Sequence, residues 1–116
     1  MNTSAPAEIH FLLDDAGALI VYEEADTYWT GLLAFSTEAK ARAFTEASHL
    51  DATEVAALDT TDADQVAALI RIVKQRAVRH MLLDLDYRSG QCMQIEFEQE
   101  RFGAAAERQL SPRRAK

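Results

Sequence analysis

The chain has 116 residues and a mass of 12.9 kDa, the size of one domain that folds without a metal or disulfide to hold it together. Apolar residues make up 48% of it and charged residues 27%, which excludes a chain that is disordered over its whole length. The net charge of −7 disfavours binding to the phosphate backbone of nucleic acids. We therefore expect a single domain over residues 1–116.

The N-terminal third predicts three strands. Residues 1–8 have no periodicity and are expected to form a loose arm. The apolar runs Ile9–Leu13 and Ala18–Glu23 flank a turn that contains Gly17, which predicts a hairpin. Gly31–Phe35 is predicted to form a third, buried strand.

The middle of the chain predicts a helix, a strand and a second helix. The alanine-rich segment 36–49 is expected to be helical, with Ser36 as its N-cap. Glu54–Leu58 follows as a strand. Segment 62–78, capped by Thr61 or Asp62, carries apolar residues at helical spacing, and these should be buried: Val66, Leu69, Ile70 and Val73.

The C-terminal part predicts one hairpin and a tail. His80–Tyr87 and Cys92–Glu98 alternate between apolar and polar residues on either side of a turn. Residues 104–116 are expected to be flexible or weakly helical, with Ala104–Leu110 as the candidate for a short helix. The resulting order, β-β-β-α-β-α-β-β, predicts an α+β fold with a mixed sheet of five or six strands and two main helices packed on it.

Two stretches carry a resemblance to a known family. They are GLLAFSTEAKARAFTEAS and EVAALDTTDADQVAALIRIVKQRAVRHMLLDLD, which lie within about residues 31–86. This succession of strand, capped helix, strand, amphipathic helix and strand resembles the SseB-like domains of bacteria. The resemblance implies a small bacterial α/β domain, and it brings no catalytic residues with it.

Few residues form a pattern typical of a catalytic or metal-binding site. Asp84 and Asp86 are predicted to share one face of a strand, about 7 Å apart, and they are the candidate ligands for a divalent cation. Cys92 has no neighbouring histidine or helix N-terminus to activate it, so we expect an unpaired, dispensable thiol. With no complete catalytic set and no cofactor motif, we expect a non-enzymatic protein without a cofactor, and a small-ligand or metal-binding protein is the alternative.

Several surface features favour an interaction with a second protein. Residues 1–60 carry 11 acidic and 2 basic side chains, whereas residues 61–116 have a net charge of +2. This asymmetry favours contact between an acidic face of one copy and a basic face of another. We expect a homodimer, or a complex with another protein, formed through the edge of the last hairpin or through other candidate contact residues: Tyr28, Trp29, Arg71, Lys74 and Arg76.

The sequence also bears on the compartment. The first ten residues lack the basic start and apolar core of a secretory signal, and no apolar run approaches the roughly 20 residues that cross a membrane. A single cysteine suits a reducing environment. We therefore expect a cytoplasmic protein with no membrane partner.

Overall fold

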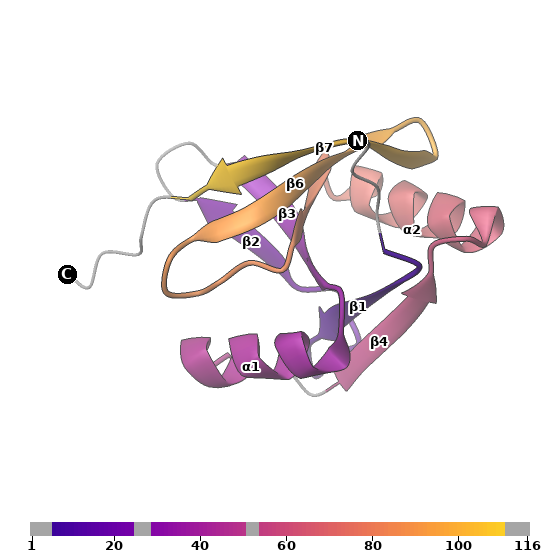
Figure 1. Cartoon of the computed structure of the whole chain (residues 1–116). Coiled ribbons are helices and arrows are strands. Elements are labelled where there is room, and N and C mark those ends of the chain that lie inside the picture. Colours follow the sequence, from indigo (N-terminus) through magenta and orange to yellow (C-terminus); the bar gives the residue numbers. More distant parts are fainter. Residues whose placement is uncertain (1–5, 25–28, 51–53, 111–116) are drawn as a thin grey trace.

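Two helices lie on a mixed seven-stranded sheet in the computed structural model, which describes residues 6–24, 29–50 and 54–110 (Figure 1). The element order is β-β-β-α-β-α-β-β-β. The strands are β1 (Glu8–Leu13), β2 (Val21–Glu24), β3 (Trp29–Phe35), β4 (Glu54–Asp59), β5 (His80–Leu83), β6 (Gln91–Glu98) and β7 (Arg101–Gln109). The helices are α1 (Glu38–Ser48) and α2 (Ala63–Gln75). The predicted α+β class is confirmed, and the sheet has one strand more than the sequence indicated.

The sheet order is β4-β1-β3-β5-β6-β7, and β2 also pairs with β3. Strands β3 and β5 are parallel, and every other described pairing is antiparallel. Because successive side chains of a strand point to opposite faces, Leu32 and Leu33 of β3 belong to different apolar clusters. The cluster on one face includes the buried side of α2, and the cluster on the other includes Ala41 and Phe44 of α1.

The predicted N-terminal hairpin is right in its turn and wrong in its pairing. The turn closes where the Gly17 N–H donates to the Asp14 carbonyl at 2.9 Å. Beyond it, the chain pairs with β1 only at an isolated bridge between Leu13 and Leu19, and β2 then pairs with β3. The reason is competition for partners, because β1 already pairs along its length with β4 and at its middle with β3.

Helix α1 begins one residue later than predicted. Thr37, rather than Ser36, is the N-cap, and its hydroxyl accepts a hydrogen bond from the Lys40 N–H at 3.1 Å. Helix α2 confirms the strongest sequence signal. Asp62 caps it by accepting from the Asp64 and Gln65 N–H groups, and the four predicted apolar residues are buried.

The end of the chain differs most from expectation. Segment Ala104–Leu110 does not form a helix, because Arg101–Gln109 is strand β7 and pairs antiparallel with β6. The free edge of β6 provides a full ladder of hydrogen bonds, which outweighs the small helical preference of three alanines. The prediction that the β5–β6 hairpin ends the sheet is therefore wrong. Residues 111–116 lie outside the described part.

The loose arm predicted for residues 1–8 is wrong at its C-terminal end. Strand β1 begins at Glu8, and Thr60 donates a backbone hydrogen bond to the Ala7 carbonyl at 2.9 Å. Residues 1–5 lie outside the described part. Among the described residues, none belongs to a helix that is long and apolar enough to span a membrane.

Candidate functional site

The parallel strands β3 and β5 end side by side, and the candidate site lies at this edge of the sheet. Ser36 follows β3, and Asp84 follows β5. Ligands of open α/β sheets commonly bind outside the carboxyl ends of parallel strands. The loop from Asp84 to Gly90, which joins β5 to β6, forms one wall of this region.

Asp84 links the end of β5 to the start of α1. Its backbone has a positive φ of 58°, and its N–H donates to the Ala34 carbonyl at 2.8 Å. One carboxylate oxygen accepts from the Ser36 N–H at 2.7 Å, and the other accepts from the Ser36 hydroxyl at 2.9 Å. The Lys40 ammonium lies 3.4 Å from that second oxygen. This carboxylate therefore holds the two strand ends and the helix together.

Asp86 has a separate role within the loop. Its carboxylate accepts from the Arg88 N–H at 3.0 Å, and its carbonyl accepts from the Gly90 N–H at 2.8 Å. The hydrogen bond from Arg88 is the main cause that lowers the pKa of Asp86, so this exposed side chain carries its charge at neutral pH.

The structure does not place Asp84 and Asp86 on one strand face, because β5 ends at Leu83. Their carboxylates have different hydrogen-bond partners. Within residues 6–24, 29–50 and 54–110, no three His, Cys, Asp or Glu side chains are grouped so that they could hold a metal ion. The metal-binding alternative depends on the prediction that Asp84 and Asp86 share one strand face, and that prediction is wrong.

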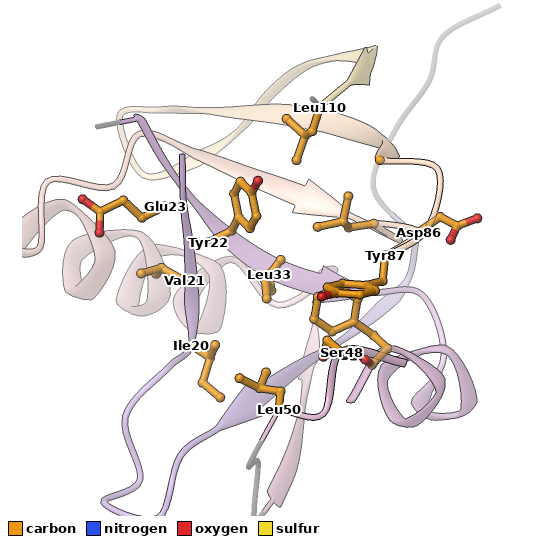
Figure 2. Close-up of a pocket in the computed structure, with 13 residues that line it drawn as sticks. Ile20, Val21, Tyr22, Glu23, Leu33, Ser48, Leu50, Asp86, Tyr87 and Leu110 are labelled. Atoms are coloured by element: carbon orange, nitrogen blue, oxygen red, sulfur yellow. Dashed lines mark hydrogen bonds between the residues drawn. The ribbon is translucent and has the colours of Figure 1, made fainter. Parts of the chain in front are cut away.

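A hollow of about 300 Å³ opens beside this loop, on the face of the sheet that carries α1 (Figure 2). Its lining comes from β2 with the residue before it, from β3, from α1 and the segment after it, from the β5–β6 loop and from the residue after β7. The lining residues are Ile20, Val21, Tyr22, Glu23, Leu33, Phe44, Ser48, Leu50, Leu85, Asp86, Tyr87, Gly90 and Leu110. Of these, only Asp86 was singled out by the sequence pattern.

The other predicted site residues lie elsewhere. Tyr28 is outside the described residues, and Trp29 is the first residue of β3. On α2, Arg71 forms an ion pair with Glu100 at 2.7 Å, and the Lys74 ammonium donates to the Gln99 carbonyl at 2.8 Å. The Arg76 guanidinium, just after α2, donates to the Leu19 carbonyl at 2.9 Å. These three cations form contacts within the chain, and their role toward a partner stays a prediction.

Cys92 is a buried thiol in the cluster beneath α1. Burial raises the pKa of Cys92 to about 11, with the Arg108 charge opposing this rise. We expect iodoacetamide to alkylate the native protein slowly at pH 7.5 and the urea-unfolded protein quickly, because the thiolate is the reactive form. Rapid alkylation of the native protein would contradict the buried position.

Burial also changes the cost expected for replacing Cys92. The sequence predicted a small cost on the premise of a site near the surface, and Cys92 is only 8% exposed. Cys92→Ser brings a hydroxyl into the apolar cluster, so we expect the free energy of unfolding to fall by about 1–3 kcal/mol. Cys92→Ala is the control, because it removes the sulfur without adding a polar group. Urea unfolding measures both variants.

His80 is a buried histidine on β5, opposite Glu96 of β6. Burial lowers the pKa of His80, and the charge of Arg108 lowers it further, as does that of Arg79, whereas Glu96 opposes the shift. The unfolded chain takes up a proton near pH 6.5 and the folded chain only at lower pH. We therefore expect the free energy of unfolding to fall as the pH drops below about 6.5.

Substitutions of two histidines test whether His80 causes this loss of stability at low pH. His80→Gln should reduce the loss of stability between pH 7 and pH 5, as measured by urea unfolding. His49→Asn is the matched control: His49 is exposed with a φ of 56°, a backbone conformation that asparagine tolerates. An equal loss of stability in wild type and His80→Gln would refute the role of His80.

The fold and site together define an α+β domain with a hollow at the carboxyl edge of its parallel strands. Comparisons of the chain with protein-family models, with curated proteins and with solved structures found no significant match. The resemblance to SseB-like domains therefore stays a prediction from the sequence.

Proposed function

We propose that this protein is a non-enzymatic interaction domain that forms a homodimer through the free edge of β7. The observation that carries the proposal is the sheet order, which among the described strands ends on β7 at one side and on β4 at the other. Strand β7 has nine residues, and Ala104, Ala105 and Ala106 at its centre allow a second strand to approach closely. An unpaired strand edge offers N–H and C=O groups to another chain.

The pairing with β6 defines which backbone groups of β7 point outward. The Leu110 N–H donates to the Gly90 carbonyl, so this pair is hydrogen-bonded toward β6. Because such pairs alternate in an antiparallel ladder, the N–H and C=O groups of Ala105, Glu107 and Gln109 point away from β6. The irregular register between Ile95 and Phe97 limits this flat edge to the second half of β7.

We propose an antiparallel register that fits these outward groups and the charges. With Ala106 on the two-fold axis, Ala105 pairs with the partner's Glu107, and both residues have outward backbone groups. A shift that centres Glu107 on the axis places two carboxylates opposite each other, which is unfavourable. Ala106 then lies opposite the partner's Ala106 in a non-hydrogen-bonded pair, with a Cα separation of about 4.5 Å.

We expect light scattering to show a mass that rises from 12.9 kDa toward twice that value as the concentration increases. Glu107→Pro should keep the protein monomeric, because it removes an N–H that points to the free edge while leaving the β6 ladder intact. Glu107→Ala is the control, since it retains this N–H and should still dimerise. A constant mass of 12.9 kDa would refute self-association.

A cysteine placed on the axis tests the register. Ala106→Cys should form an intermolecular disulfide in air, because the expected Cα separation lies within the range of about 4.4–6.8 Å that a disulfide spans. Ala104→Cys, at another exposed alanine of β7, should not cross-link, because it lies opposite the partner's Arg108. Equal cross-linking of both variants would contradict this register.

We also propose that the protein is cytoplasmic. The support is that its one cysteine, Cys92, is a buried free thiol, as is usual in a reducing compartment.

A further inference from the structure

The hollow beside the β5–β6 loop has an apolar floor and aromatic walls. Leu33, Leu85 and Leu110 form part of the floor, and each is at least nine-tenths buried. Figure 2 shows the side chains of Tyr22 and Tyr87 on opposite sides of the hollow, one from β2 and one from the loop. A hollow with apolar and aromatic lining residues and a few polar groups at its rim is a common form of small-molecule site, and about 300 Å³ is at the lower end of the range of volumes.

The wall formed by Tyr87 is positioned before any ligand arrives. Its ring meets the ring of Phe44 edge-on, with 5.8 Å between centroids, and Phe44 in turn contacts Phe35 at 5.5 Å. Two backbone hydrogen bonds close the loop on both sides of this residue: Asp86 N–H to the Gln91 carbonyl, and Gly90 N–H to the Asp86 carbonyl. The hollow therefore needs little ordering to bind a ligand, which favours affinity.

The charged side chains that line the hollow are acidic. Its lining includes two carboxylates, Glu23 and Asp86, and no Lys, Arg or His. Both side chains are exposed, and Figure 2 shows them at opposite ends of the rim, with their carboxylates turned outward. The whole chain has a net charge of −7, so the surrounding field also attracts cations and repels anions.

We propose that this hollow binds a small organic cation with an apolar body, such as an alkyl or arylalkyl amine. The apolar body would lie on the leucines of the floor. The ammonium group would lie near the Tyr87 ring, whose face attracts cations, and near the Asp86 carboxylate. Neither feature suits a carboxylate or phosphate ligand, which would meet like charge on the lining.

Three probes that each carry a phenyl ring and differ in their polar group test this proposal: phenethylamine, phenylacetate and phenethyl alcohol. Each is titrated into the full-length protein at pH 7 and followed by the amide chemical shifts of Tyr87 and Gly90. We expect saturable binding of the amine, about tenfold tighter than that of the acid, with the alcohol between them. Added salt should reduce the difference in affinity between the amine and the acid, because it screens the charges.

Two variants locate the binding determinants. Asp86→Asn keeps an acceptor for the Arg88 N–H, so the loop stays closed, and amine binding should weaken about threefold. Asp64→Asn, on α2 at the other face of the sheet, removes the same charge and should leave the affinity unchanged. Tyr87→Leu should weaken the amine more than the alcohol.

Three results would overturn the proposal. The first is the absence of saturable amine binding. The second is equal binding of amine and acid, which would show that charge plays no part. The third is equal weakening by Asp86→Asn and Asp64→Asn, which would show that only the overall charge of the protein matters. None of these results depends on dimerisation, because Glu107→Pro provides a monomeric protein for the same titration.

Discussion

Leu69→Ala should lower the free energy of unfolding by about 2–5 kcal/mol, through lost burial and the cavity left behind. Leu69 lies on α2 and is 6% exposed, within the cluster that joins this helix to the sheet. Alanine has a higher helix propensity than leucine, so the loss reports packing and not the helix itself. Such a loss is a large part of the 5–15 kcal/mol typical of a domain.

The matched control for Leu69→Ala is on the same helix. Ile72 is 51% exposed, and Ile72→Ala should change the free energy of unfolding by less than about 1 kcal/mol. Urea unfolding followed by circular dichroism measures both variants, with unchanged m-values showing that the same surface unfolds. Equal losses in the two variants would contradict the orientation of α2 on the sheet.

The two helices were predictable because their information is local. In α2 the apolar spacing defines the buried face, and the Asp62 side chain caps the N-terminus within three residues. Strand β7 was not predictable in this way. Three consecutive alanines suit a helix by propensity, and only the presence of β6 beside them favours an extended backbone.

The alternation over His80–Tyr87 predicted one continuous strand, and this prediction was wrong for a different reason. It predicts Met81, Leu83 and Leu85 on one face of a single strand. In the structure Met81 and Leu83 belong to the cluster with α2, whereas Leu85 belongs to the cluster with α1. The left-handed backbone at Asp84 ends the strand and sends the chain to the other side. A polar–apolar alternation carries no signal for such a change of φ.

The candidate site was the least predictable part. The hollow brings together Tyr22, Phe44, Tyr87 and Leu110, which are far apart in the sequence. Its aromatic and leucine residues have the composition of an ordinary core, so no motif distinguishes them. The sequence did select Asp84 and Asp86 as unusual, and both lie in the loop beside the hollow, with roles that differ from metal binding.

Asp84→Ala should be the second most damaging of these substitutions, with a loss of about 2–4 kcal/mol in the free energy of unfolding. The change removes both acceptors of Ser36, whose N–H is then left without its carboxylate partner. It also places alanine at a φ of 58°, where asparagine, aspartate and glycine are better tolerated. The exposed ion pair with Lys40 adds little, so Lys40→Ala should cost less than about 1 kcal/mol.

Asp84→Gly separates the two causes. Glycine adopts the positive φ without strain but provides no carboxylate, so this variant should be more stable than Asp84→Ala by about 1 kcal/mol and still less stable than wild type. Urea unfolding of the three proteins gives the comparison. If Asp84→Gly matches wild type, the bonds to Ser36 contribute nothing and the conformation alone matters. If it matches Asp84→Ala, the carboxylate is the whole effect, and the link between β5 and α1 is what this residue provides.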